Sequence, residues 1–175
     1  MTKQFKGTGQ LALRADRLPA RSRVGLMLIG AQLALDRLRV SHDFPIAHSA
    51  FELARRWYDN DRIAPAQIED ALAHEHNKGV VDCEVAAQSE PELSAWLVIE
   101  DTLLYTAFHA TKEAGEHPSS LISNVEENIF DDFEGHMRAL SPTTVDILFQ
   151  AADLLSNCPR ASFAQLKSTI YRSDS

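Results

Sequence analysis

The stretch that decides the fold spans residues 89–110 and reads SEPELSAWLVIEDTLLYTAFHA. Ser89 is a favoured helix N-cap, and Pro91 suits the first turn of a helix. From Leu93 onward, apolar side chains cover more than half of the helical circumference. We therefore expect a central, buried helix over about residues 90–113.

Both sides of this stretch carry further helix signals, in which apolar residues recur at three- and four-residue steps behind a start signal. Two-residue hairpin signals and strictly alternating stretches are absent, so strands are not expected. Residues 80–89 fit either an extended segment or an irregular helix, and the pattern leaves this open. The expected additional helices cover residues 19–40, 43–58, 64–79, 123–137, 141–158 and a short turn within 161–171.

These segments predict an all-α, single-domain bundle of about six or seven helices around the central helix. The domain is expected to cover residues 1–175, with 19–158 as the helical core and 1–18 as a loosely ordered terminus. Gly25 and Gly30 lie inside an expected helix and lower its helix propensity. We expect them to be there because another element packs closely against them.

Charge is distributed unevenly along the chain, whose net charge is −8. Residues 1–62 hold 11 Lys and Arg against 6 acids, whereas residues 63–175 hold 6 Lys and Arg against 19 acids, a net charge of −13. Binding to a phosphate backbone depends on Lys and Arg, so direct nucleic-acid binding is not expected. A partner with a basic surface is expected instead.

Several other classes of protein are disfavoured by the sequence. No apolar run is long enough to span a membrane, and the first twenty residues lack the apolar core of a secretory signal. Cys83 and Cys158 have no metal-ligand spacing, which favours a reducing, cytoplasmic compartment. The run His74-Glu75-His76 is expected at a solvated helix end, where residues two apart point away from each other. No catalytic residue, metal or cofactor is expected.

Two carboxylates, Glu100 and Asp101, interrupt the most apolar helix. An unpaired buried charge is too costly to keep, so we expect Asp101 to accept a hydrogen bond from a neighbouring helix or from a partner. A structural polar pair and a partner-binding pair both fit this pattern. General acid–base catalysis is not expected, because the sequence shows no second catalytic residue that would act together with this pair.

A second group of acids lies in the helix expected over residues 123–137, where Glu127, Asp131 and Glu134 form one stripe. Like charges this close repel one another unless something cationic meets them. A solvated face and a docking surface for Lys and Arg both explain the run. The candidate partner-binding residues are therefore Glu100, Asp101, Glu126, Glu127, Asp131, Asp132 and Glu134.

The order of these features resembles the Imm6 family. The similarity rests on Gly25-Leu26-Met27-Leu28, on Arg56-Trp57-Tyr58, on Ser94-Ala95-Trp96-Leu97-Val98-Ile99-Glu100-Asp101 and on Tyr105-Thr106-Ala107-Phe108, within residues 24–138. The family pattern often has Trp at or near the positions of Tyr58 and Phe108. These two differences preserve aromatic packing but leave the subfamily open.

Imm6 proteins are all-helical immunity proteins of bacterial polymorphic toxin and contact-dependent growth inhibition systems. The resemblance implies a protein that stays in the producing cell and neutralises the C-terminal domain of one toxin by stoichiometric binding. A nuclease toxin fits, because its substrate groove is basic. The choice of contact residues above rests on charge, not on the resemblance. A helical metal-binding protein or enzyme, and a helical adaptor unrelated to toxins, are the alternatives.

Overall fold

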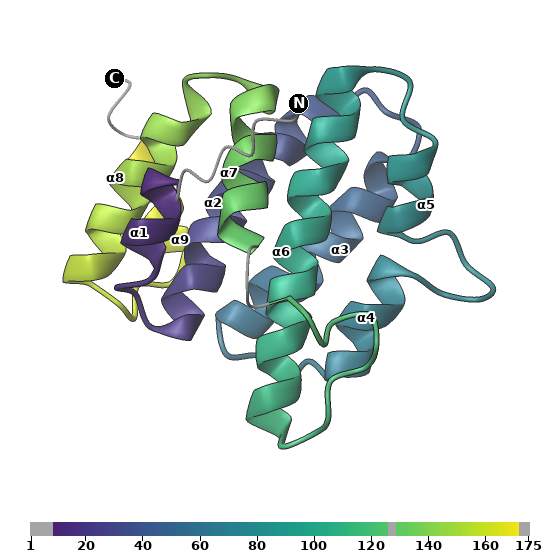
Figure 1. Cartoon of the computed structure of the whole chain (residues 1–175), viewed down its shortest axis with the longest axis horizontal. Coiled ribbons are helices and arrows are strands. Elements are labelled where there is room, and N and C mark those ends of the chain that lie inside the picture. The colour runs from purple at the N-terminus through teal and green to yellow at the C-terminus, as the bar shows by residue number, and fades with distance from the viewer. Residues whose placement is uncertain (1–8, 126–128, 172–175) are drawn as a thin grey trace, which may run out of the picture.

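The computed structural model describes residues 9–125 and 129–171 of the chain. All regular structure in these residues is helical, and the helices form a bundle (Figure 1). The helices are α1 (Gln10–Ala15), α2 (Ala20–Leu38), α3 (Phe44–Tyr58), α4 (Pro65–Leu72), α5 (Val80–Val85), α6 (Glu90–Ala114), α7 (Ile129–Leu140), α8 (Thr144–Asn157) and α9 (Phe163–Tyr171).

The expected central helix is confirmed as α6, the longest helix in the described residues. Ser89 caps it by accepting a hydrogen bond from the backbone N–H of Glu92, and Gly115 ends it in the left-handed conformation, with φ of 71°. Helices α2, α3, α4, α5 and α7 all pack against α6. The all-α class is therefore confirmed, although the described residues contain nine helices instead of six or seven.

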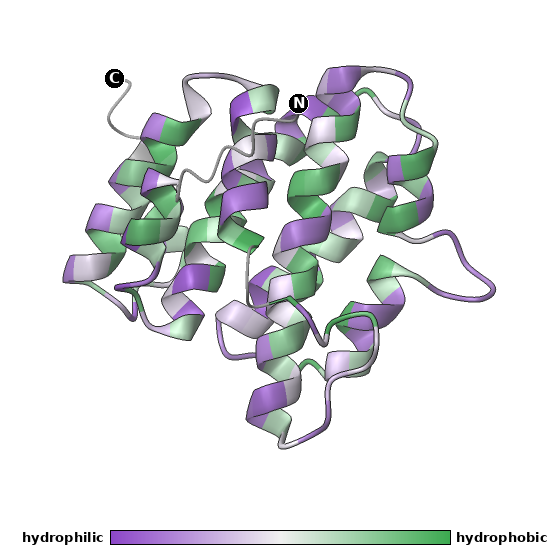
Figure 2. Cartoon of the chain, viewed as in Figure 1, coloured by the Kyte–Doolittle hydropathy of each residue, from purple (hydrophilic) through white to green (hydrophobic). Residues whose placement is uncertain are grey.

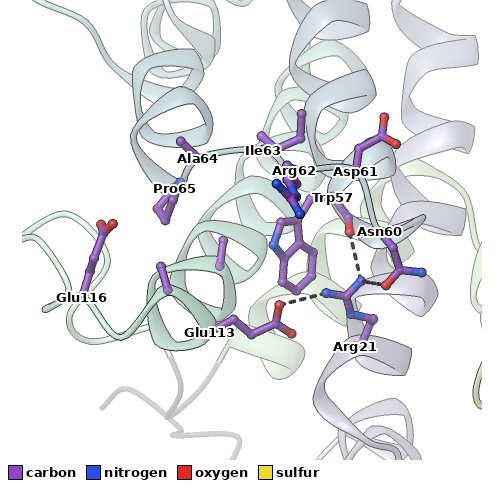
Figure 3. A pocket seen from close by; sticks show the side chains of 12 residues that line it. Arg21, Trp57, Asn60, Asp61, Arg62, Ile63, Ala64, Pro65, Glu113 and Glu116 are labelled. Carbon is purple, nitrogen blue, oxygen red and sulfur yellow. Dashed lines mark hydrogen bonds and ion pairs between the residues drawn. The ribbon is translucent and has the colours of Figure 1, made fainter.

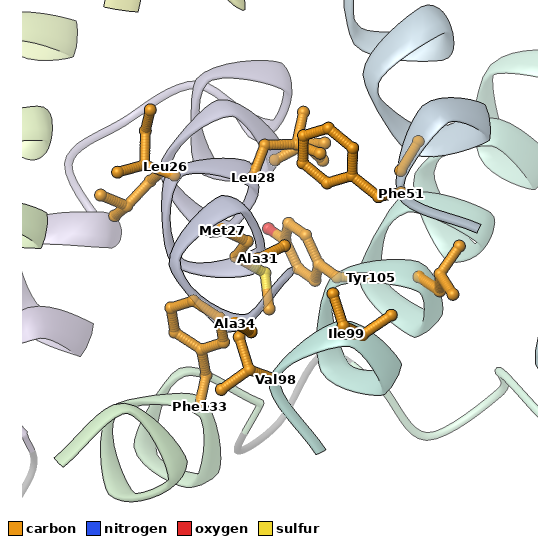
Figure 4. Close-up of a cluster of buried hydrophobic side chains, with 14 of the residues drawn as sticks. Leu26, Met27, Leu28, Ala31, Ala34, Phe51, Val98, Ile99, Tyr105 and Phe133 are labelled. Carbon is orange, nitrogen blue, oxygen red and sulfur yellow. The ribbon is translucent and has the colours of Figure 1, made fainter. Parts of the chain in front are cut away.

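The core lies between α2 and α6 (Figure 4). Met27 and Ala31 of α2 lie beside Tyr105 of α6, and Phe133 of α7 closes one side of the cluster. All four side chains are at most 1% exposed. Burying this apolar area is the main source of the bundle's stability.

The two glycines of α2 allow aromatic rings from other helices to approach closely, as expected. A Cβ atom on Gly25 would lie 2.8 Å from the Tyr58 ring, and one on Gly30 would lie 2.6 Å from Cζ of Phe133. Real Cβ atoms essentially never come this close to another heavy atom. Tight packing of α3 and α7 against α2 thus explains both positions.

Two expected boundaries were wrong, and one segment that the pattern left open has a defined structure. Helix α4 ends at Leu72, so the His74–His76 run lies in a bend after the helix and not at a helix end. Residues 120–125 form turns, so Ser123 does not begin a helix. The segment left open at residues 80–89 contains the short helix α5. No helix among the described residues is long and apolar enough to cross a membrane.

The expectation of a loose N-terminus was wrong for residues 10–18. These residues form α1 and the turn after it, and Leu11 and Ala15 are fully buried. Helix α1 packs against α7 and α8. The position of α1 bears directly on the acids of α7.

Candidate functional site

The candidate acids lie on the two adjacent helices α6 and α7. Glu100 and Asp101 project from the middle of α6, while Asp131, Asp132 and Glu134 lie in the first half of α7. Glu126 and Glu127 fall outside the described residues. The structure gives the five described acids four different environments.

Asp101 is paired with a histidine of α7. It is 8% exposed, and its Oδ2 atom lies 2.7 Å from Nδ1 of His136. Burial raises the pKa of Asp101, and the hydrogen bond with His136 opposes that rise. The same contact raises the pKa of His136 above its ordinary value, which favours the imidazolium form. The expected hydrogen bond from a neighbouring helix is therefore confirmed.

Glu100 faces another carboxyl group. Its carboxyl group interacts with that of Glu84 of α5, and its Oε2 atom is buried without a hydrogen-bond partner among the described residues. Burial, followed by the contact with Glu84, raises the pKa of Glu100 to about 7. Near neutral pH the Glu100 carboxyl group is therefore protonated for part of the time, because burial and the neighbouring carboxyl group of Glu84 both disfavour its charged form.

Two acids of α7 are used inside the protein to hold α1. Asp131 accepts a hydrogen bond from the backbone N–H of Gly9 at 2.9 Å, and Glu134 accepts one from the N–H of Leu11, also at 2.9 Å. These N–H groups begin α1 and have no acceptor within the helix. Glu134 is only 4% exposed and also binds Arg138 at 2.6 Å. The α7 acids thus meet the positive end of a helix of the same chain.

Asp132 remains exposed and lies on the side of α7 that faces α6. Its negative charge raises the pKa values of both Asp101 and His136, which indicates that it lies near that pair. Glu84, Glu100, Asp101 and Asp132 therefore share one surface across α5, α6 and α7, which we call the anionic face. His136 adds the positive charge that the sequence analysis did not anticipate.

A separate cavity of about 520 Å³ lies beside Arg21 and Trp57 (Figure 3). The Arg21 guanidinium lies over the Trp57 ring at 4.4 Å and donates to the Trp57 carbonyl, to Asn60 Oδ1 and to Glu113 Oε2. Asn60 adopts a φ of 75°, a left-handed conformation that Asn tolerates. Because Arg21 is already engaged on every side, we assign it a structural role in joining α2, α3 and α6.

The described residues contain no group of three or more His, Cys, Asp or Glu side chains arranged to hold a metal ion. His74 and His76 contact each other edge to face, with ring centroids 5.9 Å apart. The arrangement on α5 to α7 is thus an ionic surface built from carboxylates and one histidine.

A model of the immunity protein family Imm6 matches residues 22–141, which extend from α2 to the end of α7. The chain belongs to the Imm6 family. No curated protein and no solved structure gave a match to the chain. The resemblance noted in the sequence is therefore confirmed.

Membership in Imm6 implies an immunity protein that acts against a toxin, and such proteins are generally not enzymes. The aromatic residues that carried the resemblance are structural. Trp57 is 5% exposed, Trp96 is 1% exposed, and Phe108 is 5% exposed. They are part of the core of this chain and do not indicate where it contacts a toxin.

The Imm6 match includes the whole anionic face and leaves out α1, α8 and α9. Sequence reasoning found Glu100, Asp101 and Asp132 but missed Glu84 and His136. Both missed residues lie on helices that only the tertiary fold brings beside α6. Glu84 and His136 belong to no sequence motif, so their residue types alone did not indicate a site.

Proposed function

We propose that this Imm6 protein binds the C-terminal domain of one bacterial toxin and neutralises it, using the anionic face as the contact surface. The observation that carries the proposal is the gathering of Glu84, Glu100, Asp101 and Asp132 on three adjacent helices. A predominantly negative face attracts a partner of positive charge and speeds their encounter.

The chemistry of the partner follows from this surface. A toxin domain with clustered Lys and Arg complements the face, and a nuclease is one such domain because its substrate groove binds phosphates. Asp131 lies at the edge of the proposed contact. Glu134 is left out of it, because α1 covers its carboxylate. Glu126 and Glu127 stay predictions from the sequence.

A charge-reversal experiment tests this proposal in cells. The double variant Glu84→Lys and Asp132→Lys places cations beside Glu100 and Asp101, so the fold is not expected to suffer. The control, Asp70→Lys with Glu116→Lys, makes the same change in net charge at exposed positions on α4 and after α6. Each variant is expressed together with the toxin domain encoded beside it in the genome.

The wild type and the control are expected to protect cells from the toxin, and the anionic-face variant is expected to fail. Equal protection by all three proteins would show that the anionic face is not the contact surface. Failure of the wild type to protect against any neighbouring toxin would contradict the proposed function itself.

A further inference from the structure

An apolar row of side chains runs along one side of α6 that the neighbouring helices cover only in part. Leu93, Leu97 and Leu104 of α6 are each partly exposed, although most residues of this helix are buried. Their spacing of four and seven residues places them on one side of the helix, and Glu100 lies in the same row. We call these three leucines the leucine stripe.

Helices α5 and α7 both pack against α6 (Figure 1). Glu100, in the row of the leucine stripe, interacts with Glu84 of α5, and the next residue, Asp101, contacts His136 of α7. Figure 2 shows hydrophobic segments along the part of α6 that is visible between these two helices. Val85, at the end of α5, is another apolar side chain and is 81% exposed. The leucine row thus carries Glu100 within it, and it has Glu84 of α5 and the Asp101–His136 pair as neighbours.

This arrangement matches the anatomy of protein interfaces, which have an apolar centre and a polar rim. Three partly exposed leucines in one row beside charged groups form a surface that a partner with apolar and basic side chains would complement. A second copy of this chain is a poor occupant, because it would bring its own carboxylates against Glu84 and Glu100.

We propose that the leucine stripe forms the apolar centre of the toxin interface and receives a toxin segment whose apolar side chains are flanked by Lys or Arg. This inference rests on the proposed function and adds to it a division of roles. Burial of the stripe holds the complex together, while the neighbouring carboxylates speed and orient the encounter.

The test compares the leucines of the stripe with an exposed leucine elsewhere. The double variant Leu93→Ser and Leu97→Ser alters the stripe without touching Leu104, which also packs against the core. The control variant is Leu13→Ser on α1, where the leucine is 51% exposed. Association and dissociation rates with the purified toxin domain are measured for each protein, and circular dichroism verifies that each is folded.

The stripe variant is expected to bind the toxin roughly tenfold to a hundredfold more weakly, mainly through faster dissociation, whereas the control binds like the wild type. The Glu84→Lys and Asp132→Lys variant is expected to lose mainly association rate. A folded stripe variant whose affinity stays within about threefold of the wild type would overturn the inference and leave the proposed function standing.

Sedimentation of the wild-type protein alone tests whether a second copy of the chain covers the leucine stripe. A monomer is the expected result. A dimer that dissociates in the stripe variant would show that a second copy covers the leucines, and it would overturn the assignment of this stripe to the toxin.

Discussion

Glu100 and Asp101 are neighbours in the sequence but meet opposite surroundings. Oδ2 of Asp101 lies 2.7 Å from Nδ1 of His136, and this hydrogen bond satisfies the carboxyl group of a residue that is only 8% exposed. Glu100 meets the carboxyl group of Glu84 instead, and burial raises its pKa to about 7. A Lys or Arg from a partner would supply the missing positive charge at Glu100, so binding is expected to release a proton near neutral pH.

Glu100→Gln tests the cost of ionising this residue in the free protein. The folded-state pKa lies above the ordinary glutamate pKa of 4.5, so the contribution of Glu100 to stability is full below that value and is lost as the pH rises through about 7. Gln mimics the protonated form. We expect the variant to be more stable than the wild type by about 1 kcal/mol at about pH 8, after allowance for partial exposure, and little different at about pH 4.5.

Urea unfolding of both proteins at the two pH values measures this difference. Glu116→Gln is the matched control, because Glu116 is exposed. A stability gain from Glu100→Gln that is the same at both pH values would contradict the assigned pKa.

At the residue scale, the sequence was sufficient to predict that Asp101 needs a partner, because burial cost follows from the apolar pattern around it. It was not sufficient to identify His136, which lies 35 residues away on another helix. Nor could the pattern show that Glu134 is covered. Helical spacing places it on an outer stripe, and only the docking of α1 buries it.

At the scale of elements, two glycines test the packing of α2 against α7. Gly30→Ala gains helix propensity but places a Cβ 2.6 Å from Phe133, which is fully buried and cannot move aside. We expect a net loss of about 1–2 kcal/mol. Gly135→Ala on α7 meets nothing within 4 Å and is expected to gain about 0.5–1 kcal/mol. Thermal unfolding compares the two, and a stable Gly30→Ala protein would contradict the close contact.

A pair of leucines tests whether α1 belongs to the folded core. Leu11 is fully buried, whereas Leu13, two residues later, is 51% exposed. Leu11→Ala is expected to cost about 2–4 kcal/mol of unfolding free energy, and Leu13→Ala less than about 0.5 kcal/mol. Chemical denaturation measures both. Equal, small effects would indicate that α1 does not dock on α7 and α8.

The long helices were predictable because their apolar residues repeat at helical spacing over many turns, as in α6 and α2. Helix α1 was not, because its six residues are too few to form a stable helix alone. Its stability depends on tertiary contacts, including the hydrogen bonds from Gly9 and Leu11 to the acids of α7. The helix expected over residues 123–137 corresponds to α7, but its start was wrong because residues 120–125 form turns after α6.

At the scale of the whole molecule, the negative charge is concentrated in residues 63–175, which have a net charge of −13 and contain α5, α6 and α7. An anionic surface of this kind attracts a basic partner over distances comparable to the Debye length, and salt weakens that attraction. We therefore expect the distribution of charge along the chain to set the rate at which the molecule associates with its target.

The most direct test is the affinity of the purified chain for its toxin domain at about 50 mM and about 300 mM NaCl. The wild type and the Asp70→Lys, Glu116→Lys control are expected to form an equimolar complex that weakens by roughly tenfold at the higher salt concentration. The Glu84→Lys, Asp132→Lys variant is expected to bind weakly at both concentrations and to lose most of the salt dependence. Wild-type affinity and salt dependence in that variant would contradict the claim that the anionic face binds the toxin.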